Sequence, residues 1–587
     1  MLKQYIAGFM LIAGMLVMVG CGSGRPEADL VYISGSGHNT MDPQRMSWLH
    51  DFRVARCLYE PMLRYDFKNG EFMAGVAKSW EMSADGLRYT FNIREDAKWS
   101  NGEPVRAEDF YWAWMRVCMP DQAADYSEFF YPIKGVQAFY QWRLDQLSDF
   151  VKQYPKGDQA AADAMYERTK KQFKETVGIT TPNEQTVVVE LERPTPYFLQ
   201  LVAFTTYTPT HHQSVMANMR VNAETGAITL DATYWSDPKR LVTNGPYVLV
   251  KRQFKQYLYM KANDQYWNRA AMKNDSVLER IIENPETALR VYGDSREGID
   301  LWPDVPASGA IGELLINASK EGKRNDVHVI ESAGTYFYNF SCSNERTQAG
   351  APNPLRDARV RKAMAMSIDR QYIVDRVTRV GQPIARTFVP PNTIVGYTPP
   401  VEDGITFDPE PAKSLLDEAG YPGGDGFPTL TLLFNTGNMH EFPAQAIVKM
   451  WETHLGINVN LQGVETKVFG DRLKKHDFDI SRAGWYGDYP DPTTFLNKMA
   501  AHSNNNDADW QDQQYNALLE KAANELDPPK RMKILEEAEG LMLESAPMAL
   551  IYQYNHLRLY NAERVKGLAE QDNAWNKFYM EFISVEK

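Results

Sequence analysis

The sequence predicts an α/β protein with more than one domain, and three observations support this. The chain has 587 residues, which is more than one hydrophobic core usually holds. Strand-like and helix-like stretches alternate after a polar spacer at 22–29. The hydrophobic content of 43% and the charged content of 24% are ordinary for a globular protein, so we expect packed cores.

The strands are indicated by alternating apolar and polar side chains. Residues 87–96, LRYTFNIRED, alternate as a half-buried strand does, and residues 186–192, TVVVELE, are interpreted in the same way. Residues 247–263 hold two such runs around a short polar break, which predicts a β-hairpin.

Two helices are the clearest in the chain. In residues 407–422, Asp408 can cap the free amides, Pro409 suits the first turn and Gly420 ends the helix. Residues 356–377 predict a second, continuous helix. Its apolar face consists of Val360, Ala363, Met364, Ile368 and Ile373.

Residues 141–176 form a polar, alanine-rich and highly charged segment. The pattern predicts an exposed helical hairpin that breaks at 155–157. Such composition is typical of a solvated face, so we interpret the segment as a solvated insertion without a binding role.

The N-terminal segment predicts export. Lys3 precedes an apolar run that ends at Gly20. The length of this run and the residues on either side of it are typical of a secretory signal peptide. The sequence Met18-Val19-Gly20-Cys21 resembles the lipobox of bacterial lipoproteins. This resemblance implies that 1–20 is a lipoprotein signal peptide and that Cys21 is lipidated. The mature protein would then be held by lipid at a membrane surface outside the cytoplasm, on the periplasmic side or the cell surface.

The other cysteines are Cys57, Cys118 and Cys342. Three thiols in an oxidising compartment permit at most one disulfide, and the sequence does not select the pair. Their apolar neighbours favour buried structural thiols.

Composition and motifs argue against several functions. The formal net charge is −13, whereas a nucleic-acid binder needs a basic surface. Thr40 stands where a dinucleotide-binding motif after residues 35–37 would have its third glycine. No phosphate loop, nucleophile elbow or zinc-protease helix occurs in the sequence. The adjacent His211 and His212 point apart, which favours a surface or capping role over a shared metal. We therefore expect a protein that is not an enzyme and has no cofactor or metal.

Five long segments carry a family resemblance. They are 80–116, 241–268, 354–374, 460–499 and 546–560. Together they resemble the extracytoplasmic solute-binding proteins of family 5, and specifically the oligopeptide-binding members that serve ABC importers. The likeness runs from about Leu30 to the C-terminus, apart from 141–176.

The resemblance implies a periplasmic-binding-protein-like type II fold. Two lobes would close on a cleft around a hinge, and the first lobe would be split into two domains. The chain would cross between lobes near 334–335 and near 551–552. The implied bounds are 21–52, 205–335 and 553–587 for domain I, 53–204 for domain II with the helical insertion, and 336–552 for domain III.

Asp488 is the central candidate for ligand binding. In the oligopeptide-binding members, the acid at this position pairs with the α-amino group of the peptide. A buried ammonium needs such a partner because an unpaired buried ion costs several kcal/mol. The preceding residues would pair with the peptide backbone and wall a side-chain pocket, with the glycines on either side of Trp485 allowing close approach. These residues are Ala483, Gly484, Trp485 and Tyr486. The alternative is that Asp488 caps its own loop.

Four further residues are candidates. Arg482 and His440 match groups that meet peptide carboxylates in the relatives, and Tyr336 and Tyr338 are candidates for the cleft or hinge. Structural roles stay open: ion pairing for the first two, and core packing for the tyrosines and for Trp485.

The chain also departs from the family pattern. Thr466 replaces a tryptophan next to the ligand, and Leu473 replaces an arginine directed at peptide carboxyl ends. Gly334 and Tyr486 stand where one branch of the family has a disulfide. We expect amino-end recognition to be retained, while pocket size, peptide length and carboxyl-end recognition stay open.

The sequence therefore predicts a monomeric, lipid-anchored protein that captures oligopeptides and delivers them to the permease subunits of an ABC importer. One alternative keeps the fold but changes the ligand to a dipeptide, nickel chelate, haem or sugar. Others are a peptide-sensing receptor and a secreted hydrolase, the latter without a recognisable catalytic motif.

Overall fold

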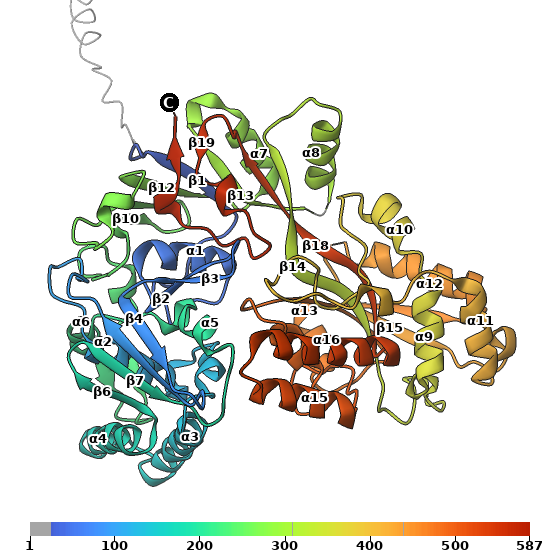
Figure 1. Ribbon diagram of the computed structural model, residues 1–587, viewed down its shortest axis with the longest axis horizontal. Coiled ribbons are helices and arrows are strands. Elements are labelled where there is room, and N and C mark those ends of the chain that lie inside the picture. The colour runs from blue at the N-terminus through green and yellow to red at the C-terminus, as the bar shows by residue number, and fades with distance from the viewer. Residues whose placement is uncertain (1–24, 308, 438, 587) are drawn as a thin grey trace, which may run out of the picture.

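The computed structural model describes residues 25–307, 309–437 and 439–586. The predicted signal peptide, the lipobox and Cys21 lie outside these residues. Figure 1 shows two bodies, which we call the first lobe, containing β1 (Leu30–Ser34), and the second lobe, containing β15 (Leu430–Asn435). Within the described ranges, no helix has the length and apolar character needed to cross a membrane.

A ten-stranded sheet runs through both lobes in the order β10-β11-β12-β1-β13-β18-β14-β17-β15-β16. Its remaining strands are β10 (Tyr247–Gln253), β11 (Tyr257–Ala262), β12 (Ser276–Ile281), β13 (Leu301–Val305), β14 (Val327–Phe340), β16 (Val459–Val464), β17 (Ile480–Tyr486) and β18 (Met548–Tyr560). The long strands β14 and β18 pass from one lobe to the other (Figure 1). Their antiparallel register shifts between Glu331 and Thr335, next to the predicted crossing at 334–335. Such irregular pairing bends strands locally, so this point suits a hinge.

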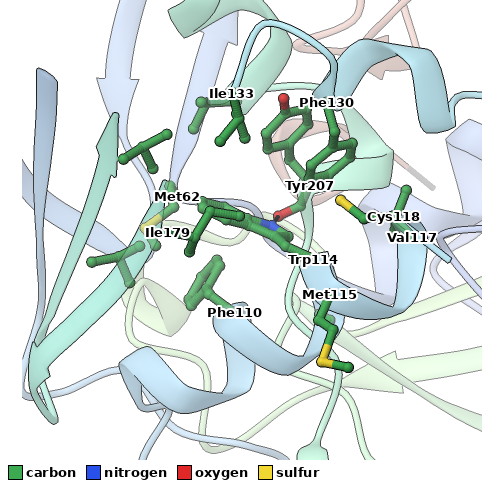
Figure 2. Close-up of a cluster of buried hydrophobic side chains, with 14 of the residues drawn as sticks. Met62, Phe110, Trp114, Met115, Val117, Cys118, Phe130, Ile133, Ile179 and Tyr207 are labelled. Carbon is green, nitrogen blue, oxygen red and sulfur yellow. Dashed lines mark hydrogen bonds between the residues drawn. The ribbon is translucent and has the colours of Figure 1, made fainter. Parts of the chain in front are cut away.

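The first lobe has a second, antiparallel sheet in the order β4-β5-β7-β6. These strands are β4 (Ala77–Met82), β5 (Arg88–Ile93), β6 (Ile179–Asn183) and β7 (Thr186–Glu190), which confirms the strands expected at 87–96 and 186–192. Figure 2 shows the core beneath it, where Trp114 Nε1 donates a 2.9 Å hydrogen bond to the Tyr207 carbonyl. Phe130 stacks on Tyr207 with ring centroids 3.9 Å apart.

The remaining elements of the first lobe lie around these sheets. They are α1 (Leu49–Leu58), β2 (Leu63–Asp66), β3 (Glu71–Ala74), α2 (Ala107–Val117), α5 (Phe198–Val202), α6 (His212–Ala217), β8 (Met219–Val221), β9 (Ile228–Leu230), α7 (Pro285–Gly293), α8 (Ala310–Lys320), β19 (Val565–Lys566) and β20 (Ser584–Val585). His211 accepts a hydrogen bond from the Ser214 amide as the N-cap of α6, which confirms the capping role expected for it. The hairpin predicted at 247–263 is confirmed as β10 and β11.

The helical hairpin is present as α3 (Val136–Gln153) and α4 (Gln159–Thr176). Its break contains the expected residues 155–157, but the hairpin is attached more firmly than a solvated insertion would be. Arg143 is fully buried and its guanidinium lies 2.8 Å from the Asp121 carboxylate. A buried ion pair is strongly destabilised when one partner is lost, so this contact ties the hairpin to the lobe.

The second lobe carries most of the later helices. They are α9 (Ala358–Met366), α10 (Arg370–Tyr372), α11 (Pro409–Glu418), α12 (Glu441–Leu455), α13 (Thr466–Leu473), α14 (Thr493–Leu496), α15 (Gln513–Asn524) and α16 (Pro528–Ser545). The prediction of a single helix over 356–377 is wrong, because α9 ends at Met366. A separate helix, α10, begins at Arg370, where the Asp369 carboxylate forms the N-cap by accepting a hydrogen bond from the Tyr372 amide. The apolar face was predicted correctly, since its five residues are all buried. Asp408 occupies the N-cap of α11, but its side chain makes no capping hydrogen bond.

We propose the domain division expected above, because separate hydrophobic clusters correspond to its parts. The packing departs from the expected bounds at two places: Leu58 belongs to the cluster of domain I, and Tyr207 belongs to the cluster of domain II. One cluster contains Leu30, Phe52 and Met580, and a second contains Phe91 and Trp114. Two further clusters belong mainly to the second lobe. Separate cores of this kind are the basis of separate domains.

The three described cysteines are free thiols. Cys57 and Cys118 are buried, as predicted, and burial raises the pKa of both thiols. Cys342 is only half-buried, and burial of its thiol raises the pKa to about 11. All three therefore remain protonated at neutral pH.

Candidate ligand-binding site

A cavity of about 730 Å³ lies between the two lobes. The first lobe contributes the start of α1, including Trp48 and His50, together with Tyr126 and Lys577. The second lobe contributes the end of β17 and the turn after it, and β18 contributes Tyr552 and residues 554 to 557. A cavity of this size, with apolar walls and a few polar groups, is typical of a ligand-binding site.

The alternation of β17 decides which of its residues face the cavity. Arg482 and Tyr486 line it, whereas Ala483 and Trp485 pack into a hydrophobic cluster of the second lobe. Trp485 Nε1 donates a 2.7 Å hydrogen bond to the Thr494 carbonyl, which fixes the ring in that cluster. In this structure Trp485 therefore packs in the core and does not wall the cavity. The reason is that successive side chains of a strand point to opposite faces, so Trp485 lies on the face opposite to Arg482 and Tyr486.

The two glycines of this segment are needed for contacts within the chain. A Cβ on Gly484 would overlap with the Tyr554 hydroxyl, and a Cβ on Gly487 would lie 2.8 Å from the Trp575 ring. On the side where a Cβ would lie, aromatic side chains of the chain itself fill the space. The expectation that these glycines allow close approach of a ligand backbone stays a prediction. One edge of residues 482–486 pairs with β14, while β15 pairs with β17 only as far as Ser481. The second edge beyond Ser481 is thus not covered by a strand among the described residues.

Asp488 lies two residues after the end of β17 and lines the cavity. Its amide donates a 2.9 Å hydrogen bond to Thr494 Oγ1, which holds the turn. Its carboxylate accepts a 3.2 Å hydrogen bond from the Tyr126 hydroxyl of the first lobe. Lys577 Nζ, also in the first lobe, donates a 3.0 Å hydrogen bond to the Asp488 carbonyl. Within the described residues, the Asp488 carboxylate forms no ion pair with a lysine, arginine or histidine.

Burial has the largest effect on the pKa values of Asp488 and Lys577. Desolvation raises the pKa of Asp488 to about 6, although Lys577 and the Tyr126 hydroxyl partly oppose it. Desolvation likewise lowers the pKa of Lys577 to about 7, with the Arg56 guanidinium acting in the same direction. An opposite charge that entered the cavity would favour the ionised form of Asp488.

Arg482 is the cation on the same wall of the cavity. Its guanidinium carbon lies 5.0 Å from the centroid of the Tyr336 ring, and Nη1 donates a long, 3.5 Å hydrogen bond to Asn435 Oδ1. Its Nε is buried without a hydrogen-bond partner in the described part of the chain. No described carboxylate pairs with it. A half-buried guanidinium whose Nε has no partner is suited to an anionic ligand group.

His440 also lines the cavity, and its Nδ1 lies 3.4 Å from the Tyr336 hydroxyl. Desolvation, with Arg482 nearby, lowers the pKa of His440 to about 3, so the ring is neutral at pH 7. Tyr336 and Tyr338 are fully buried in the core of the second lobe and do not belong to the cavity wall. Tyr336 instead supports the wall, because it lies beneath Arg482 and stacks on Tyr552 at 4.6 Å.

Sequence reasoning missed Tyr126, Lys577 and the start of α1. Tyr126 carries no local signal, because its partner Asp488 is 362 residues away. Lys577 had a weak signal, a lysine between aromatic residues, and its ammonium lies about 5 Å from the rings of Phe67 and Phe204. Thr466 and Leu473, the two departures from the family pattern, lie in α13 and are not part of the cavity wall. Gly334 lies opposite Tyr486 in the β14–β17 pairing.

The fold and this cavity define an α/β binding protein whose two lobes enclose the ligand site. A family model described as bacterial extracellular solute-binding proteins, family 5, matches residues 71–507. The chain belongs to this family, whose members are binding proteins of the extracellular or periplasmic space.

Individual relatives match over most of their length. The oligopeptide-binding protein OppA of Bacillus subtilis is 32% identical over 521 residues, covering 88% of this chain and 85% of the relative. The periplasmic murein peptide-binding protein MppA of Escherichia coli is 30% identical over 524 residues, covering 89% and 86%. The solved structure of unliganded, open MppA matches with a TM-score of 0.74 and 28% identity, covering 95% of this chain and 98% of that one. Haemophilus influenzae OppA in complex with the peptide RPPGFSPFR matches with a TM-score of 0.68 and 25% identity, covering 96% and 100%.

Proposed function

We propose that this protein is a lipid-anchored, extracytoplasmic substrate-binding protein that captures oligopeptides between its lobes and delivers them to an ABC importer. The observation that carries the proposal is the pair of charges on one cavity wall. Asp488 and Arg482 both line the cavity, and neither has an ion-pair partner among the described residues. A peptide brings one ammonium and one carboxylate, which are the two charges that these groups lack.

The amino end of the peptide would bind at Asp488. Its carboxylate is half-buried beside the Tyr126 hydroxyl, so a ligand ammonium would complete a short, charge-assisted hydrogen bond. The uncovered edge of 482–486 would pair with the peptide backbone, which leaves the side chains to the wider cavity. The names of the relatives support a peptide as the ligand class, since they include proteins that bind oligopeptides and murein peptides.

The carboxyl end of a short peptide would bind at Arg482. His440 would add a hydrogen bond as a neutral donor, because its ring is uncharged at neutral pH. We propose no catalytic role for any cavity residue.

Export and anchoring rest on the lipobox. We propose that residues 1–20 are removed and that the monomer is attached to the membrane through lipid on Cys21, facing the permease subunits. A Cys21→Ser variant is therefore expected in the soluble fraction outside the cytoplasm, while the unchanged protein sediments with membranes. Equal membrane association of both would contradict the anchor.

The ligand class is tested by mass spectrometry of compounds released when the purified protein is denatured. Co-purified peptides of mixed sequence are the expected result, because main-chain recognition tolerates many side chains. A single non-peptide compound at one equivalent per chain would overturn the proposal in favour of another ligand on the same fold.

A further inference from the structure

A cluster of two histidines and two carboxylates lies where the first lobe meets the cavity. His38 is in the loop after β1, His50 and Asp51 are at the start of α1, and Glu279 is on β12. His38, Asp51 and Glu279 are buried, and the His50 side chain is 20% exposed and lines the cavity. The proposed binding of a peptide by Asp488 and Arg482 does not involve these four residues.

The contacts of the cluster divide into an inner and an outer set. His38 Nδ1 lies 2.7 Å from Asp51 Oδ1, and His50 Nε2 lies 3.6 Å from the same oxygen. One ligand atom from each of His38, His50 and Asp51 lies within 4.8 Å of the other two. The opposite nitrogen of His38, Nε2, lies 2.9 Å from the Glu279 carboxylate.

We propose that His38, His50 and Asp51 form a zinc site that opens into the ligand cavity. Two imidazoles and one carboxylate with an open fourth position are a donor set that Zn²⁺ commonly takes in proteins. A carboxylate that accepts the second N–H of a ligating histidine is the usual outer contact of such sites, and Glu279 holds that position on His38. His50 is on the cavity wall, so the open position faces the ligand.

The charges also balance when the metal is bound. Zinc would bond to His38 Nδ1, His50 Nε2 and a carboxylate oxygen of Asp51, and the proton now shared between His38 Nδ1 and Asp51 would go to solvent. The dication and the two carboxylates then sum to zero, with Glu279 still accepting from the neutral His38 ring. A buried site without net charge avoids the cost of an unpaired buried ion. The competing interpretation is that His38 serves only as an ion-pair bridge between Asp51 and Glu279.

The test is zinc binding to the ligand-free full chain after treatment with EDTA. We expect one tightly held Zn²⁺ per chain by mass spectrometry of the metal, and a thermal midpoint that rises with Zn²⁺. His50→Gln removes one ligand without breaking the buried pairs of His38, and should weaken zinc binding by at least about tenfold. His212→Gln is the matched control, because His212 is partly exposed and stacked on Trp112 outside the cluster. It should bind zinc as the unchanged protein does.

A second measurement is independent of any variant. Co²⁺ in place of zinc should give the intense visible absorption of a four-coordinate ion. Weak absorption, as for Co²⁺ in water, or equal zinc binding by His50→Gln and the unchanged protein, would overturn the site and leave His38 as an ion-pair bridge. Because the protein carries no peptide in these measurements, their failure would not affect the proposed peptide binding at Asp488.

Discussion

The Tyr126 hydroxyl donates a hydrogen bond of 3.2 Å to Asp488 Oδ1 and so connects the two lobes across the ligand cavity. The next residue extends this contact, because Tyr489 stacks on Tyr197 of the first lobe at 5.0 Å. The segment after β17 therefore contacts both lobes. A ligand ammonium bound at Asp488 would interact with the carboxylate at the point where the lobes meet, which couples binding to closure.

Replacing Asp488 with Asn should weaken the binding of peptides with a free amino end by about 2–4 kcal/mol, or roughly 30- to 1,000-fold. The reason is that the ligand ammonium would be buried without its counter-charge. Isothermal titration calorimetry with one peptide in free and N-acetylated forms measures the effect. The acetylated form should bind both proteins equally, and equal losses for the two forms would mean that Asp488 only supports the turn.

Tyr126→Phe provides a graded comparison. It removes the hydroxyl that donates to Asp488 and retains the ring, so the loss should be about 0.5–1.5 kcal/mol, which is the contribution of one hydrogen bond. A loss as large as that of Asp488→Asn would assign the recognition to Tyr126 instead.

Peptide affinity should depend on pH in two directions. The pKa of Asp488 is raised to about 6 by burial, so its carboxyl is protonated below this pH and cannot pair with an ammonium. Affinity should therefore rise from pH 5 to pH 7, and fall above about pH 8 as the α-amino group of the peptide loses its proton. Calorimetry across this range, with the N-acetylated peptide as the control, measures the profile. A flat response of the free peptide between pH 5 and pH 7 would contradict the assignment.

The second acid of this turn, Asp491, should affect stability rather than binding. Both of its carboxylate oxygens pair with Arg531, at 2.6 and 2.8 Å, and both side chains are buried. Asp491→Asn should lower stability by about 3–5 kcal/mol, because it leaves a buried guanidinium unpaired. Thermal unfolding measures this, and Asp488→Asn is the matched control three residues away, with little expected change in the midpoint.

Gly484→Ala should destabilise the protein by about 1–3 kcal/mol, since the new methyl group would overlap with the Tyr554 hydroxyl. The double variant with Tyr554→Phe should regain most of this loss. Without the hydroxyl, the nearest ring atom of residue 554 lies 3.3 Å from the new Cβ. Denaturant titration of the two single variants and the double variant measures the coupling. Additive losses would mean that the ring, not the hydroxyl, requires glycine here.

The sequence by itself determined the fold class, the strands at 87–96 and 186–192, the helical hairpin and the position of Asp488 after a strand. These features are local, because strand alternation, helix periodicity and a long family segment are each contained within a few tens of residues. The incorrect prediction of one continuous helix over 356–377 also has a local cause. There the apolar face was correct, but Asp369 formed a cap that interrupts the helix.

Only the tertiary structure decided which residues form the cavity. It placed Trp485 in the core and Arg482 on the wall, filled the space beside Gly484 with Tyr554, and brought Tyr126 and Lys577 to Asp488. It also assembled His38, His50, Asp51 and Glu279 from three separate segments. The physical reason is that a cavity wall is made by contacts between distant parts of the chain, which the periodicity of any one segment does not contain.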